Sequence, residues 1–209
     1  MRTRAVVFDM DGTLIESTSC VVGAYQAAVA AGGLPAPTAA AVVEAYPLGP
    51  PRAILTHFLG RPATVADEDA YLVALRDGCH LIRVYEGIVE ALAELSDRRR
   101  LAVFTGASAA AAQVLLDEVG LRSQFHAVVG GDEVRRAKPH PDGILLALDR
   151  LGVPAAEAAY VGDSPADMGA ANAARTNSIS AAWGHQYDPS CQSDLVAATP
   201  RDLVTLMRE

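Results

Sequence analysis

Short apolar runs alternate with longer segments rich in alanine and leucine along most of the chain. Five runs have the length of buried strands, at residues 5–8, 101–104, 127–129, 158–161 and 179–182. Segments with the length and composition of helices lie between them, at residues 108–119, 141–151 and 165–174. Continuous apolar strands that alternate with helices are typical of a parallel sheet covered on both faces. The pattern therefore predicts an α/β fold with a three-layer core.

Residues 17–84 interrupt this alternation. The segment contains no convincing strand, and proline and glycine punctuate it repeatedly. Apolar residues at helical spacing predict four helices within it, at residues 21–31, 39–45, 52–59 and 69–82. We therefore expect two units: a core formed by residues 1–16 and 85–209, and an inserted all-helical subdomain formed by residues 17–84.

The composition fits a folded domain and disfavours one class of partner. Of the 209 residues, 51% are hydrophobic and 20% are charged, so the chain can bury a sizeable core. The formal net charge is -8, and the longest basic run is the three arginines at residues 98–100. Because a polyanion binds mainly to basic patches, nucleic acid is not expected as a partner.

The spacing of the cysteines and the length of the apolar runs indicate where in the cell the protein is found. Cys20, Cys79 and Cys191 are widely spaced and odd in number, which argues against a disulfide framework and a zinc site. The first apolar run is too short for a signal-peptide core, and no stretch of about 18 uncharged apolar residues occurs. We therefore expect a cytoplasmic protein with no membrane partner, and the oligomeric state stays open.

Polar residues with catalytic potential follow the predicted strands. Ligands of open parallel sheets bind at the carboxyl ends of the strands. The residues at these ends, or just before a helix, include Asp9, Asp11, Thr105, Lys138, Asp163 and Asp167. Four carboxylates at one rim would repel each other unless a divalent cation lay among them, and oxygen ligands suit Mg²⁺. Lys138 is the only lysine of the chain, so it is the one ammonium side chain available there.

Four stretches, in this order, resemble the motifs of the haloacid dehalogenase superfamily of phosphotransferases. They are residues 9–14, 104–108, 138–141 and 161–167. The insertion after the first stretch looks like the small helical cap of the phosphoglycolate phosphatase and β-phosphoglucomutase branch. The resemblance spans nearly the whole chain and implies a Rossmann-like core, a cap, Mg²⁺ and a small phosphate ester as substrate. Each stretch alone could be a turn or a helix start, so the order of all four carries the interpretation.

The resemblance implies a role for each carboxylate of the first and fourth stretches. Asp9 would be the nucleophile, and Asp11 would act as general acid and then as general base. The side chains of Asp9 and Asp163 would bind Mg²⁺, and the backbone carbonyl of Asp11 would add a ligand. Asp167 would support the lysine or metal-bound water rather than ligate the metal.

The second and third stretches would hold the transferring phosphate. Phosphoryl transfer requires mainly positioning and neutralisation of the phosphate oxygens. The Thr105 hydroxyl, the Gly106 amide and the Lys138 ammonium therefore fit as phosphate-binding groups.

The sequence of the cap says less about the substrate than the four motifs say about the reaction. Residues 49–52 resemble a cap loop that faces the active site, so Arg52 could clamp a second anionic group. An exposed arginine at a helix start is the alternative. Two positions depart from the family pattern: Glu16 replaces the usual Asp before Ser17, and Arg175 stands where glycine usually ends a helix. We expect the second departure to strain or reshape that helix end.

These features predict an enzyme, a Mg²⁺-dependent phosphatase that hydrolyses a small phosphorylated metabolite through an aspartyl-phosphate intermediate. The metabolite would be phosphoglycolate-like or a sugar phosphate. A phosphosugar mutase shares Asp9 and Asp11 and remains an alternative. A receiver-like signalling module has a similar acidic site, but receivers are shorter and place the accepting Asp after a middle strand. Dehalogenases need no Asp11, and phosphonoacetaldehyde-type hydrolysis needs a cap lysine that the chain lacks.

Overall fold

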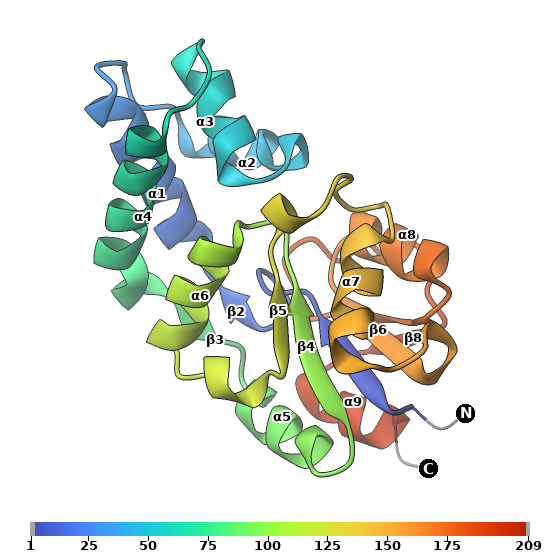
Figure 1. Cartoon of the computed structure of the whole chain (residues 1–209). Coiled ribbons are helices and arrows are strands. Elements are labelled where there is room, and N and C mark those ends of the chain that lie inside the picture. The colour runs from blue at the N-terminus through green and yellow to red at the C-terminus, as the bar shows by residue number, and fades with distance from the viewer. Residues whose placement is uncertain (1–2, 208–209) are drawn as a thin grey trace.

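A six-stranded parallel sheet forms the centre of the molecule (Figure 1). A computed structural model describes residues 3–207. The strand order is β5-β4-β1-β6-β7-β8, and every neighbouring pair is parallel. The strands are β1 (Ala5–Phe8), β4 (Arg100–Phe104), β5 (Ala127–Val129), β6 (Ala158–Gly162), β7 (Asn177–Ala181) and β8 (Leu195–Ala197). The α/β class expected from the sequence is confirmed.

Helices cover both faces of this sheet. They are α5 (Ile88–Ser96), α6 (Ala109–Glu118), α7 (Asp142–Leu151), α8 (Pro165–Ala174) and α9 (Pro200–Leu206). Alternate residues of β1 divide between the two hydrophobic clusters: Val6 and Phe8 join the cluster of α5, α6 and α9, whereas Ala5 and Val7 join that of α7 and α8. Because both faces are covered, all four side chains are buried, which explains the unbroken apolar run.

In the six-stranded sheet and the α-helices that cover it, three elements were not predicted, namely α5, β8 and α9. β8 lies at the edge of the sheet, and two of its three residues are exposed, so it lacks the apolar signature of the inner strands. β7 also begins earlier than its apolar run indicates. Its polar Ser178 is buried because the backbone amide and the hydroxyl both donate to Asp194, at 2.8 and 2.9 Å.

Four helices stand together to one side of the sheet (Figure 1). They are α1 (Thr18–Ala31), α2 (Ala39–Glu44), α3 (Pro51–Leu59) and α4 (Val65–Gly78). α4 starts before the predicted position because Thr64 and Asp67 form a capping box at its N-terminus. Two linkers join these helices to the core, and they pair as the short antiparallel strands β2 (Ile15–Glu16) and β3 (Arg83–Val84). The linkers therefore lie side by side.

The end of α8 shows how the chain tolerates the absence of glycine. Arg175 adopts a left-handed conformation, with φ of 59°. Its backbone amide donates to the Asn172 carbonyl, and the Thr176 amide donates to the Ala171 carbonyl, so the helix closes as it would at glycine. The helix end keeps its form, and the strain falls on the backbone of Arg175.

Within residues 3–207, no helix is long and apolar enough to cross a membrane. All three cysteines are free thiols, and Cys20 and Cys79 are buried.

Candidate active site

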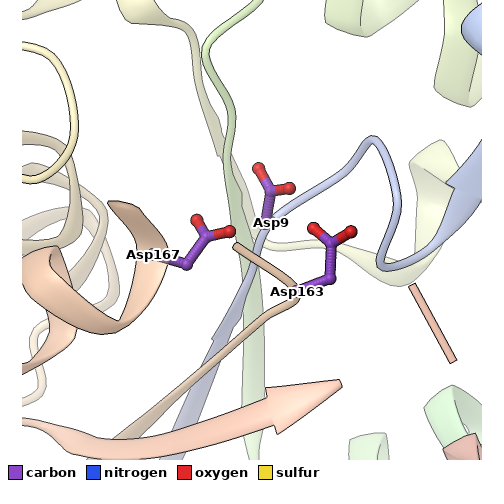
Figure 2. Close-up of side chains that lie close together, drawn as sticks. All are labelled: Asp9, Asp163 and Asp167. Atoms are coloured by element: carbon purple, nitrogen blue, oxygen red, sulfur yellow. The ribbon is translucent and has the colours of Figure 1, made fainter. Parts of the chain in front are cut away.

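The register of the sheet brings two of the expected aspartates together. Phe8 of β1 pairs with Val161 of β6, so the residues that follow each strand emerge side by side. Asp9 follows β1, and its backbone amide donates to the Val161 carbonyl at 2.8 Å. Asp163 follows β6, and Asp167 comes from the first turn of α8. Carboxylate oxygens of these three aspartates lie within 4.8 Å of one another (Figure 2).

Lys138 lies between two of these carboxylates. Its ammonium group donates to Asp9 at 2.6 Å and to Asp167 at 2.7 Å. Burial opposes the charged form of this lysine, but the two anionic partners outweigh that effect and raise its pKa above the usual value. Lys138 therefore stays a cation inside the site.

Asp167 uses both carboxylate oxygens for hydrogen bonds within the protein. Oδ1 accepts from Lys138 and from the Tyr160 hydroxyl at 2.9 Å. Oδ2 accepts from the backbone amide and the hydroxyl of Ser164, at 3.0 and 2.6 Å. Burial alone would raise the pKa of Asp167, but Lys138 and the hydrogen bonds hold it below the usual value. Asp167 is thus an anionic partner of Lys138 whose two oxygens each already accept two hydrogen bonds.

Asp163 has the opposite character. Its Oδ2 accepts from the Gln186 backbone amide at 2.9 Å, whereas its buried Oδ1 has no hydrogen-bond partner. Burial raises the pKa of Asp163 to about 6. A buried carboxylate oxygen without a donor is costly, and a hard cation removes that cost. The oxygen donors of Asp9 and Asp163 therefore fit Mg²⁺.

Asp11 lies beside this cluster and is held by two hydroxyl groups. One oxygen accepts from the Ser17 hydroxyl, and the other accepts from the Thr105 hydroxyl at 3.5 Å. Burial raises the pKa of both Asp9 and Asp11, and at Asp9 the nearby aspartates add to the rise. A carboxyl group with a raised pKa suits proton transfer.

The residue after Asp11 must be glycine. Gly12 has a φ of 84°, and a Cβ at this position would overlap the Asp163 carboxylate. The loop after β1 therefore packs directly on Asp163, and no side chain fits between them.

The expected phosphate-binding groups reach the same rim. Thr105 is buried directly after β4, and its hydroxyl also accepts from the Ala107 backbone amide at 3.1 Å. Gly106 follows it and is exposed. Thr105, Gly106 and Lys138 thus lie around the carboxyl end of β1 and its neighbours.

Arg52 is placed differently from the other expected residues. It lies in the first turn of α3, where its guanidinium donates to the Ala63 carbonyl at 3.3 Å and lies 3.8 Å from Glu68. Both partners belong to the helical segment between the linkers. The contacts of Arg52 do not join it to the aspartates of the core.

Several residues at the site were not among those expected to contribute to it. Tyr160 lies inside an apolar strand, and its hydroxyl needs a partner when buried, which was a usable signal. Ser17 was noted only as the residue that follows Glu16, with no role in the site. Gln186 contributes through its backbone amide, which every residue except proline possesses, so no side-chain pattern could have identified it.

Fold and site together define an α/β protein with an acidic centre at the carboxyl edge of its parallel sheet and a helical segment inserted after the first strand. Residues 3–175 match the family of haloacid dehalogenase-like hydrolases, and the chain belongs to that family. The resemblance drawn from the sequence and the expected enzyme class are confirmed.

Several relatives are similar over nearly their whole length. A phosphoglycolate phosphatase of Xanthomonas campestris pv. campestris is 32% identical over 219 residues, which cover 96% of this chain and 94% of that protein. An N-acetylmuramic acid 6-phosphate phosphatase of Pseudomonas aeruginosa is 29% identical, with 99% and 96% covered. The structure of CbbY from Rhodobacter sphaeroides, solved with phosphate, has a TM-score of 0.79 at 26% identity and covers 96% of both chains.

Proposed function

We propose that this chain is a Mg²⁺-dependent phosphatase that hydrolyses a small phosphorylated metabolite through an aspartyl-phosphate on Asp9. The observation that carries the proposal is the position of Lys138, bonded to Asp9 at 2.6 Å and to Asp167 at 2.7 Å, next to the unpartnered Oδ1 of Asp163. This arrangement offers a nucleophile, a fixed cation and a carboxylate oxygen able to bind a metal ion, all at the carboxyl edge of the sheet.

The metal would be held by the side chains of Asp9 and Asp163 and by the backbone carbonyl of Asp11. When bound, Mg²⁺ would neutralise charge on the phosphate oxygens and so let two anions approach. Asp167 would stay outside this set, because its oxygens are already used by Lys138 and Ser164.

Asp9 would then attack phosphorus. A carboxylate oxygen forms a bond to phosphorus, and the bond from phosphorus to the ester oxygen breaks. The leaving oxygen takes a proton from Asp11, which later removes a proton from the water that hydrolyses the aspartyl-phosphate. Ser17 and Thr105 orient the Asp11 carboxyl group for both transfers.

The phosphate itself would be held by the Thr105 hydroxyl, the Gly106 amide and Lys138. Lys138 contributes a fixed positive charge that needs no reorganisation during the reaction. Asp9 and Asp167 keep this ammonium group charged although it is buried.

Residues 17–84 would act as a cap over this site, and Arg52 would receive a second anionic group of the substrate. The relatives' names favour a small phosphorylated acid or sugar. To reach such a group, Arg52 would exchange its contacts with Ala63 and Glu68 for the ligand. The substrate class is therefore a phosphoglycolate-like ester or a sugar phosphate.

A phosphate-release screen tests this function. The purified chain is incubated with Mg²⁺ and small phosphomonoesters, and free phosphate is measured. Hydrolysis that disappears in Asp9→Asn supports the proposal, and an active Asp9→Asn protein would contradict it.

Incubation with a sugar phosphate and a bisphosphate tests the mutase alternative. A mutase would isomerise the sugar without releasing phosphate. A long-lived phosphorylated Asp9 without turnover would instead indicate a signalling module.

A further inference from the structure

The loop that follows β7 is fixed against the site at three points. The Trp183 indole donates to the Thr13 carbonyl at 2.9 Å, and the Gln186 amide donates to Asp163 at 2.9 Å. Between them, Gly184 packs so tightly on Asp163 that a Cβ there would overlap the carboxylate. His185 is therefore held in one place at the rim of the site.

Polar contacts lie on both sides of the His185 ring. The Gln186 side-chain amide donates to His185 Nε2 at 3.4 Å. On the other side of the ring, His185 Nδ1 lies 3.6 Å from the Glu16 carboxylate. Because an amide nitrogen can only donate, Nε2 accepts from Gln186, and Nδ1 is left to face Glu16.

Glu16 connects His185 to both linkers of the helical segment. It lies in β2, and its carboxylate accepts from the Thr18 backbone amide at 2.9 Å, where α1 begins. The same carboxylate accepts from the Tyr85 hydroxyl at 3.3 Å, and Tyr85 directly follows β3. The carboxylate therefore contacts the start of the helical segment and its end.

We propose that His185 is a positioning residue that couples Asp163 to both linkers through Glu16. In this role the loop holds the Asp163 carboxylate, through the Gln186 amide, in an orientation that depends on the arrangement of the linkers. Ligand orientation by a hydrogen-bonded outer shell is a general determinant of metal affinity. The inference rests on the proposed function, because it assigns Asp163 to the metal.

The coupling is expected to be modest and reciprocal. His185 and Glu16 are partly exposed, so breaking their contact should weaken Mg²⁺ binding about two- to five-fold. Reciprocity requires that Mg²⁺ stabilise the linker pairing by the same factor.

Trp183, the only tryptophan of the chain, provides a reporter in the same loop. Mg²⁺ is titrated against its fluorescence in the unaltered protein and in His185→Ala, Glu16→Gln and the double variant. The single variants should bind Mg²⁺ more weakly, and the double variant no more weakly than the weaker single variant. His185→Asn keeps a donor near the Nδ1 position and should retain the affinity. The matched control is His57→Ala, at an exposed histidine of α3 that lies outside the site.

Hydrogen exchange of the Tyr85 amide, which donates to the Leu14 carbonyl at 3.2 Å, gives the reciprocal readout. Mg²⁺ should slow this exchange in the unaltered protein and less so in His185→Ala. Unchanged Mg²⁺ affinity in His185→Ala overturns the coupling, and so does a loss in His185→Asn or His57→Ala equal to that in His185→Ala. An unaltered protein that binds no Mg²⁺ and hydrolyses no phosphate ester overturns the proposed function as well.

Discussion

The charged groups of the core and those of the helical segment are held in different ways. Lys138 is 13% exposed, and it binds carboxylates from two distant parts of the chain, Asp9 and Asp167. Arg52 is 60% exposed, and its partners are a backbone carbonyl and Glu68 of the same segment. Burial fixes the first group, whereas solvent leaves the second free to change partners. We infer that the core determines the chemistry and the helical segment selects the substrate.

The largest loss is expected at the nucleophile. Asp9→Asn removes the carboxylate that we propose attacks phosphorus and binds the metal, so kcat should fall at least about a thousand-fold. The measurement is phosphate release under saturating substrate, with circular dichroism as the control for folding. Retention of more than a tenth of the activity would place the chemistry elsewhere.

Substitution of Lys138 should damage both stability and catalysis. Lys138→Met leaves Asp9 and Asp167 as uncompensated buried carboxylates, and breaking a buried pair costs about 3–5 kcal/mol. Urea unfolding measures the stability, and the rate of phosphate release should fall at least about a hundred-fold. Lys138→Arg keeps the charge and serves as the matched variant. If Lys138→Met unfolds at the same urea concentration as the unaltered protein, the network contributes nothing to the fold.

A smaller effect is expected at Tyr160. Tyr160→Phe removes the hydrogen bond to Asp167 at 2.9 Å, and a bond to a charged group is worth about 1.5–3 kcal/mol. The free energy of unfolding should fall by that amount, while kcat should change less than about ten-fold because Lys138 still binds Asp167. Unchanged stability would show that Lys138 and Ser164 satisfy Asp167 without the tyrosine.

The smallest change in stability is expected at Arg52. Arg52→Ala removes an exposed ion pair, so the free energy of unfolding should change by less than about 0.5 kcal/mol. The KM should rise about ten-fold for phosphate esters with a second anionic group and stay constant for esters without one. Equal KM changes for both kinds of ester would remove Arg52 from substrate selection.

The sequence predicted the sheet and the residues at its edge because both follow from local patterns. Asp9 and Asp163 each follow a fully buried apolar run, and several such runs that alternate with helices indicate a parallel sheet. Edge strand β8 escaped prediction because two of its three residues face solvent.

The supporting residues depended on packing that no local pattern encodes. Tyr160 meets Asp167 only after β6 and α8 pack together, and Gln186 contributes its backbone amide to Asp163. For Arg52 the motif indicated the segment but not the direction of the side chain, which is set by Ala63 and Glu68. Distances between elements that are remote in sequence were therefore the missing information.

Borohydride trapping during turnover tests the central role of Asp9 most directly. An acyl phosphate on Asp9 is reduced to homoserine, which peptide mass spectrometry locates in the chain. We predict homoserine at position 9 when substrate and Mg²⁺ are both present, and none when a chelator removes the metal or when substrate is omitted. Steady phosphate release with Asp9 unmodified, or modification at Asp11 or Asp163 instead, would contradict the account.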